Sequence, residues 1–161
     1  MISRKMTDAI NDQVKAELES AYLYLSMAAY LEAKSLKGMA HWLKVQAKEE
    51  TEHADRFMNH LYERGARVIL ETISKPEAEF GAPLELFKAV AKHERVVTDR
   101  INKMMDLARE EKDYASQSML NWFVDEQVEE EADSDAIVDK LEFLGDSNVN
   151  IYLLDKELGL R

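Results

Sequence analysis

The sequence predicts an all-α fold, and three observations lead to this prediction. The 161 residues include only two prolines and five glycines, so the backbone is rarely interrupted. Helix-forming Ala, Leu, Glu and Lys are abundant, and apolar residues recur with a period near 3.6 in four long segments. Strand-like alternation does not persist anywhere. A single domain over residues 1–161 is the simplest arrangement for a chain of this length.

The first two helices are expected at about 5–34 and 38–64, each with one apolar face. The face of the first contains Ile10, Val14, Glu17, Ala21, Tyr24, Ala28 and Leu31. The face of the second contains Met39, Leu43, Gln46, Glu50, His53, Phe57 and Leu61. Because only a few residues before Gly38 join these segments, we expect an antiparallel pair.

A long connection and a second helical pair follow. Gly65, Pro76 and Pro83 rule out a continuous helix between the pairs, and this stretch is long enough to cross the bundle. Helices are expected at about 84–111 and 113–143. Their apolar faces contain Phe87, Val90, Glu94, Val97, Ile101, Met104 and Ala108, and then Leu120, Phe123, Gln127, Glu130, Ile137 and Leu141. A crossover between helices two and three predicts an up-down-down-up four-helix bundle.

A short fifth helix is expected at about 147–157, after a break at Gly145-Asp146. A helix of about this length is not stable alone in water. It must therefore dock on another surface, and another subunit is one candidate.

Composition excludes several classes of protein. The net charge of −11 disfavours nucleic acid as a partner and favours cations. The absence of cysteine excludes disulfides, thiolate zinc sites, iron–sulfur clusters and a rubredoxin-type iron centre. No apolar run approaches the ~20 residues of a membrane span, so we expect no membrane partner and a cytoplasmic location.

Each long helix carries polar residues within its own apolar face, near its middle. An isolated ionised carboxylate costs several kcal/mol to bury, so something positive must lie among these acids. No Lys or Arg lies on the four faces, and in a chain without cysteine a metal ion would be held by carboxylate, imidazole or amide. The interrupting residues are Glu17, Glu50 with His53, Glu94, and Gln127 with Glu130.

The four helices together approach a known metal-binding pattern. A glutamate from each of two helices plus Glu-x-x-His from the other two is typical of di-iron carboxylate bundles. Here the second Glu-x-x-His is replaced by Gln127-Val128-Glu129-Glu130. With a single imidazole, the site should hold Fe(II) less firmly than the full pattern, so iron resembles a substrate more than a permanent component. Glu49, Glu126 and Glu129 flank the site and could form a third, looser position.

At these residues the chain resembles prokaryotic non-haem ferritins over nearly its whole length. The resemblance rests on Glu17, residues 21–27, 49–54, 93–94 and 122–131, and the short last helix. It implies that Glu17, Glu50 and His53 bind a first iron and that Glu50, Glu94 and Glu130 bind a second, with Gln127 close to the pair. It also implies a third iron at Glu49, Glu126, Glu129 and Glu130.

The resemblance also implies an activity and an assembly. Such ferritins are ferroxidases: they oxidise Fe(II) with oxygen or peroxide and store a ferric mineral in a hollow shell of twenty-four subunits. Haem is not expected, because bacterioferritins carry a haem-ligand methionine directly after the glutamate of the first Glu-x-x-His, where this chain has Thr51. Rubrerythrins resemble the bundle too, but they add a cysteine-bound iron.

Other interpretations remain open at this stage. Tyr24 could hydrogen-bond a metal carboxylate or supply an electron, or it could be an ordinary core tyrosine. His41, His60 and His93 are expected at the surface or an interface. One alternative function is a di-iron peroxidase or oxygenase with permanently bound iron. Another is a helical interaction protein whose central acids are paired with Lys or Arg.

Overall fold

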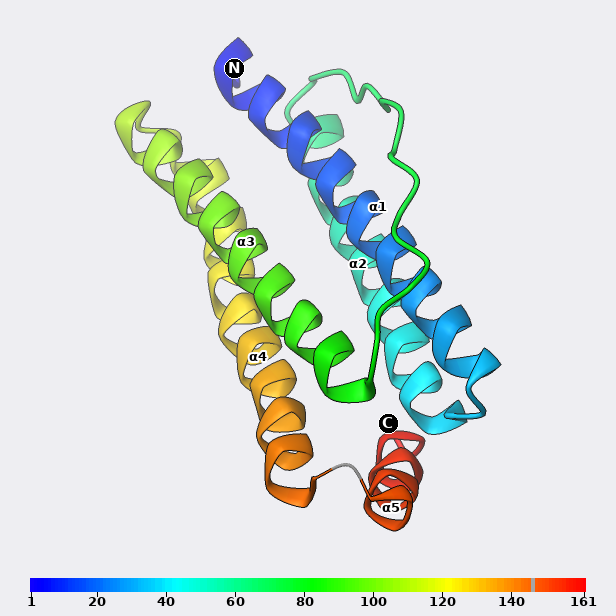
Figure 1. Ribbon diagram of the computed structural model, residues 1–161. Coiled ribbons are helices and arrows are strands. Elements are labelled where there is room, and N and C mark those ends of the chain that lie inside the picture. Colours follow the sequence, from blue (N-terminus) through cyan, green and yellow to red (C-terminus); the bar gives the residue numbers. More distant parts are fainter. Residues whose placement is uncertain (146) are drawn as a thin grey trace.

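The computed structural model describes residues 1–145 and 147–161, and this part of the chain contains helices and no strands. The helices are α1 (Arg4–Ala33), α2 (Lys37–Glu63), α3 (Pro83–Glu110), α4 (Tyr114–Leu144) and α5 (Asn148–Leu158) (Figure 1). Every helix end lies within one residue of the end predicted from the sequence. At the predicted break, Gly145 has a φ of 68°, and Asp146 lies outside the described residues. None of the described helices is both long and apolar enough to cross a membrane.

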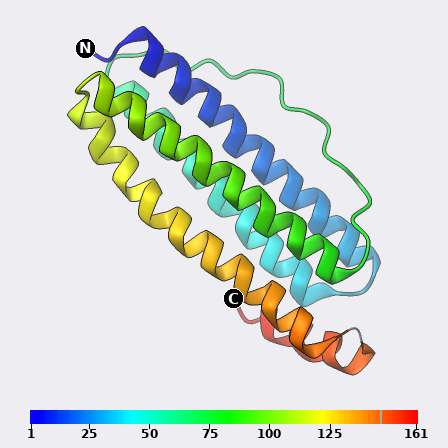
Figure 2. The same ribbon diagram turned by 60° about the vertical axis from the view of Figure 1, so that its left-hand side comes forward.

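The four long helices form two antiparallel hairpins joined by a crossover. The connection between α2 and α3 runs back along the outside of α1, so that α2 and α3 point the same way (Figures 1 and 2). Polar side chains of α1 fix this connection: Asn11 Oδ1 accepts from Ile69 N at 2.7 Å, and Tyr30 Oη donates to the Gly81 carbonyl oxygen at 2.8 Å. The predicted bundle with its long crossover is confirmed.

The fifth helix docks on its own chain, at the start of α2. Leu36, at the N-cap of α2, makes no side-chain capping hydrogen bond, and Asp155 of α5 accepts from Met39 N at 2.9 Å instead. Gly38 lies so close to α5 that a Cβ there would be 1.6 Å from the Asp155 carbonyl oxygen. Leu154 of α5 is buried in the same contact region.

The apolar core forms two clusters, one toward each end of the bundle. The cluster near α5 includes Tyr24, Leu43 and Phe87, and the cluster at the opposite end includes Val14 and Phe57. On each long helix, the predicted metal ligands fall between the parts that belong to these two clusters. The fold therefore gathers the predicted ligands of four helices into one polar layer at the middle of the bundle.

Candidate metal centre

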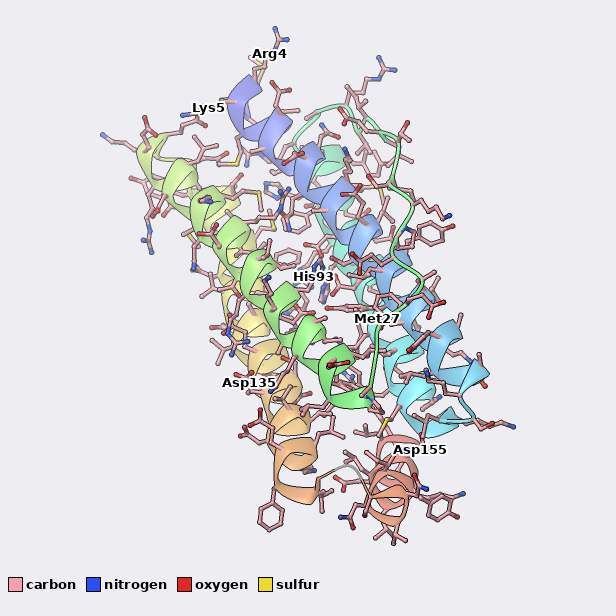
Figure 3. The ribbon with its side chains drawn as sticks, viewed as in Figure 1. Arg4, Lys5, Met27, His93, Asp135 and Asp155 are labelled. Atoms are coloured by element: carbon pink, nitrogen blue, oxygen red, sulfur yellow. The ribbon has the colours of Figure 1, made fainter. Side chains whose placement is uncertain are left out.

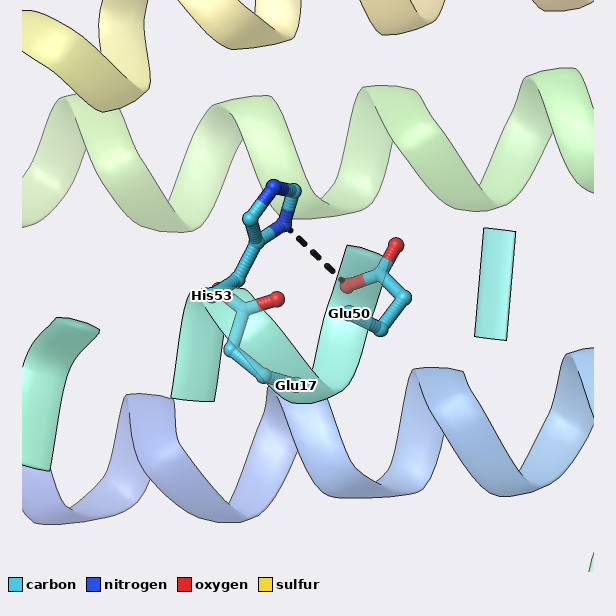
Figure 4. Close-up of side chains that lie close together, drawn as sticks. All are labelled: Glu17, Glu50 and His53. Atoms are coloured by element: carbon cyan, nitrogen blue, oxygen red, sulfur yellow. Dashed lines mark ion pairs between the residues drawn. The ribbon is translucent and has the colours of Figure 1, made fainter. Parts of the chain in front are cut away.

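Three of the predicted ligands meet in the polar layer. Glu17 from α1 and Glu50 and His53 from α2 lie close together, with His53 Nδ1 3.7 Å from Glu50 Oε2 (Figure 4). One potential ligand atom from each residue lies within 4.8 Å of the others. All three side chains are buried. They lie on the faces of α1 and α2 that carry the apolar residues, and these faces pack into the core.

Two carboxylate oxygens of this group have no partner. Glu17 Oε2 and Glu50 Oε2 are buried and make no hydrogen bond within the described part of the chain. Leaving a buried acceptor unsatisfied costs about 1–3 kcal/mol, and more if it is charged. A cation bound between these oxygens would remove that cost. Carboxylate oxygens with a single imidazole nitrogen suit a divalent first-row metal ion such as Fe(II).

The opposite side of the layer comes from α3 and α4. Tyr24 Oη donates to Glu94 Oε1, and Gln127 Nε2 donates to Glu94 Oε2 at 3.3 Å. Glu130 Oε2 accepts from the side chain of Gln46 at 2.7 Å. These contacts make Tyr24 and Gln127 hydrogen-bond donors to Glu94.

His53 faces a second group of acids with its other ring nitrogen. His53 Nε2 lies 3.9 Å from Glu126 Oε1, and His53, Glu126 and Glu130 form another group whose potential ligand atoms lie within 4.8 Å of one another. Glu129 is exposed and belongs to neither group. Glu49 forms an ion pair with Arg161, whose Nη2 donates to Glu49 Oε2 at 2.8 Å. A third iron on Glu49, Glu126, Glu129 and Glu130 therefore stays a prediction.

The electrostatics of the layer favour protons or cations. Burial raises the pKa of Glu17 well above its ordinary value, and the neighbouring charge of Glu50 raises it further. Burial likewise raises the pKa of Glu50, to which Glu94 and Glu130 add. Burial and then the charge of Glu94 raise the pKa of Glu130 to about 7. Without metal, these acids therefore keep their protons to higher pH than ordinary glutamates do, and a binding cation would displace those protons.

No arginine or lysine neutralises the central acids. In the described part of the chain, Glu17, Glu50, Glu94 and Glu130 form no ion pair with either residue type, and His53 is the only charge partner of Glu50. A helical interaction protein would pair its central acids with lysine or arginine, so the observed arrangement contradicts that alternative.

The expectation for the remaining histidines was wrong for His60. This residue is buried, with Nε2 3.0 Å from Ser116 Oγ, and burial lowers its pKa. His93 is partly buried, lies between α3 and α1 (Figure 3), and has Nε2 2.7 Å from Ser20 Oγ. His41 is exposed as expected. The contacts of His60 with Ser116 and of His93 with Ser20 join different helices, so spacing along a single helix could not reveal them.

Sequence reasoning also missed a buried glutamine. Gln13 is 1% exposed and donates from Nε2 to Glu17 Oε1 at 2.8 Å. Its position four residues before Glu17 on the same helix was the available signal. Gln46 was placed on the apolar face of α2, but its contact with Glu130 was not foreseen.

Together, the fold and the site define a four-helix bundle protein with a buried group of carboxylates and an imidazole that could hold a metal ion. A family model described as a ferritin-like domain matches residues 7–144. A bacterial non-heme ferritin of Staphylococcus aureus is 41% identical over 161 residues, which cover 100% of this chain and 97% of the relative. One from Staphylococcus epidermidis is 42% identical, with the same coverage. The chain belongs to the ferritin family.

Solved structures agree with this assignment. An open-pore ferritin from the hyperthermophilic archaeon Archaeoglobus fulgidus superimposes with a TM-score of 0.99 at 46% sequence identity. The match covers 100% of this chain and 99% of that chain.

Proposed function

We propose that this chain, an iron-storage protein of the ferritin family, oxidises Fe(II) at the centre formed by Glu17, Glu50, His53, Glu94 and Glu130. The observation that carries the proposal is the pair of buried oxygens on Glu17 and Glu50 that, in the described part of the chain, have no hydrogen-bond partner and no ion pair with lysine or arginine. The bacterial non-heme ferritins to which the chain is similar support iron as the cation.

In this proposal Fe(II) is the substrate, and Glu50 is shared between two iron positions. Glu17 and His53 complete the first position, and Glu94 and Glu130 complete the second. Each of two Fe(II) ions loses one electron, and dioxygen takes up both electrons with two protons to give hydrogen peroxide. The carboxylates balance the charge of iron as it rises from +2 to +3. Tyr24 and Gln127 hold Glu94 in place through their hydrogen bonds.

The ligand set suits iron that passes through the centre. In the described part of the chain only His53 supplies an imidazole to it, so Fe(II) should be held less firmly than at a site with two imidazoles. We propose that the group of His53, Glu126 and Glu130 receives iron on its way to storage, with Glu49 and Glu129 as outer acids.

Assembly into a shell, of twenty-four subunits in this proposal, is supported by exposed apolar side chains. Tyr22 and Leu25 of α1 and Ile69, Leu70 and Ile73 of the crossover are each at least 37% exposed in the single chain. A soluble protein normally covers an apolar surface of this kind with a partner.

Aerobic addition of Fe(II) in large excess, followed by sedimentation, tests the proposed function. We expect iron far beyond two ions per chain to travel with a large particle. Saturation near two ions per chain on a small species would instead indicate a redox enzyme with permanent iron. If no iron travels with the protein, the metal centre itself is refuted.

A further inference from the structure

Two buried glutamines join the metal centre to arginines outside it. Gln13 Nε2 donates to Glu17 Oε1 at 2.8 Å, and Gln46 Nε2 donates to Glu130 Oε2 at 2.7 Å. Both glutamines are at most 1% exposed. The side-chain oxygen Oε1 of Gln13 accepts from Arg100 Nε at 2.8 Å, and the side-chain oxygen Oε1 of Gln46 accepts from Arg161 Nη1.

The chemistry of the two neighbours fixes the orientation of each amide. A guanidinium group only donates hydrogen bonds, and a carboxylate whose proton has been displaced by a bound cation only accepts them. If the Gln13 amide turned over, its NH2 group would face Arg100 and its oxygen would face Glu17. Neither contact would then be a hydrogen bond, and polar groups would be left unsatisfied in a buried place. The arginine therefore determines which end of the amide faces the centre.

Each arginine is itself held by contacts outside the metal centre. Arg100 Nη2 donates to Asp12 Oδ2 at 2.7 Å and to the Asp12 carbonyl oxygen at 3.1 Å. Arg161 donates to Glu49 at 2.8 Å, and its guanidinium lies over the Trp42 ring, 4.8 Å from the ring centroid. Two chains of contacts thus reach the centre from different sides, one through α1 and one through α2.

The donated hydrogen bond occupies one oxygen of each acid. Glu17 Oε1 accepts from Gln13, while Glu17 Oε2 is the buried oxygen that has no partner in the described part of the chain. We propose that Gln13 and Gln46 are positioning residues, oriented by Arg100 and Arg161, that hold Glu17 and Glu130 with one oxygen turned toward iron. This inference rests on the proposed function of the centre.

Binding of Co²⁺, which needs no oxidation step, tests the inference on the assembled protein. Gln13→Leu and Gln46→Leu should each weaken Co²⁺ binding by about tenfold or more, as is usual when a partner of a metal ligand is removed. Arg100→Ala should weaken it in the same direction and change the visible absorption spectrum of bound Co²⁺. Arg100→Lys retains a cationic donor and should restore most of the affinity.

Arg95→Ala is the matched control for Arg100→Ala. Arg95 lies on the same helix and pairs with Asp135 at 2.7 Å, but it contacts no buried glutamine. A purely structural role of Arg100 predicts that both alanine variants lower the melting temperature and leave Co²⁺ affinity and spectrum unchanged, and this result would overturn the inference. If the unmodified protein binds no Co²⁺ and oxidises no Fe(II), the proposed function fails, and the inference fails with it.

Discussion

Glu50 shows at the scale of one residue how function and stability oppose each other. Its side chain is 1% exposed, one of its oxygens has no hydrogen-bond partner in the described part of the chain, and burial is the largest cause of its raised pKa. A neutral side chain of the same shape would fit this place with less cost. In the proposed function, the carboxylate is kept because iron needs a negative ligand that reaches both proposed positions.

Glu50→Gln should therefore stabilise the metal-free protein while impairing its reaction. We expect a gain on the order of 1 kcal/mol in the free energy of unfolding, because the substitution removes a buried acid whose ionisation is costly and keeps the side-chain volume. The initial rate of Fe(II) oxidation should fall by about tenfold or more. Calorimetry and stopped-flow absorbance measure the two effects.

Glu52→Gln is the control for this substitution. Glu52 lies on the same helix, is exposed and pairs with Lys48 at 3.3 Å. It should change neither quantity much. An oxidation rate in Glu50→Gln equal to that of the unmodified protein would remove Glu50 from the centre.

The sequence could reveal the buried acids of the centre but not the residues of other helices that hold them in place. Glu17, Glu50 and Glu94 interrupt apolar faces of period 3.6, and that pattern depends only on each helix. Arg100 reaches Gln13 across 87 positions of the chain, and this contact exists only because α1 and α3 pack side by side. The same reason hid the contact between His60 and Ser116.

At the scale of the helix, α5 is the element whose place the sequence left open. Its length predicts that it must dock, and its own residues do not say where. Gly38 determines the docking position of α5, because its missing Cβ lets the backbone of α5 approach α2. The Asp155 side chain then takes over the capping of α2, near the positive end of the helix dipole.

Gly38→Ala should displace α5 from the bundle. The added Cβ would lie 1.6 Å from the Asp155 carbonyl oxygen, which is backbone and cannot simply rotate away. We expect a loss of about 1–3 kcal/mol in stability, as for other overpacked sites. Hydrogen exchange followed by mass spectrometry should show faster exchange in residues 148–158.

Lys37→Ala changes the preceding, exposed residue and should leave this exchange unaltered. If Gly38→Ala preserves the protection of residues 148–158, the close approach of α2 and α5 is not what holds the short helix. Because Arg161 follows α5, a displaced helix should also free Glu49 from its ion pair.

At the scale of the whole molecule, the polar layer divides the core into two apolar clusters. Four helices each supply part of the layer, so a cation at the centre would tie both hairpins together. Without it, the hairpins meet across groups that prefer water or a proton. The stability of the bundle should therefore depend on both pH and metal.

This dependence can be predicted in sign from the acids of the layer. Their pKa values are raised in the folded state, so the folded protein binds more protons than the unfolded chain. Stability from such groups is complete below their ordinary pKa and is lost as pH rises through the folded value. For Glu130 the window runs from 4.5 to about 7. Lys44 lowers the pKa of Glu32, so the stability that Glu32 contributes is lost only as pH falls below that window.

The histidines His60 and His93 have lowered pKa values and oppose this trend only below pH 6.5, so the metal-free protein should melt at a lower temperature at pH ~8 than at pH ~6.5. Co²⁺ should reverse the trend, because metal binding displaces protons and strengthens as their concentration falls. Calorimetry with and without Co²⁺ across this range measures both curves, and their separation should widen as pH rises. In Glu50→Gln, the separation between the curves with and without Co²⁺ should increase less with pH. A metal-free melting temperature that rises steadily between pH ~6.5 and pH ~8 would show that the acids of the layer are already neutralised by some other group.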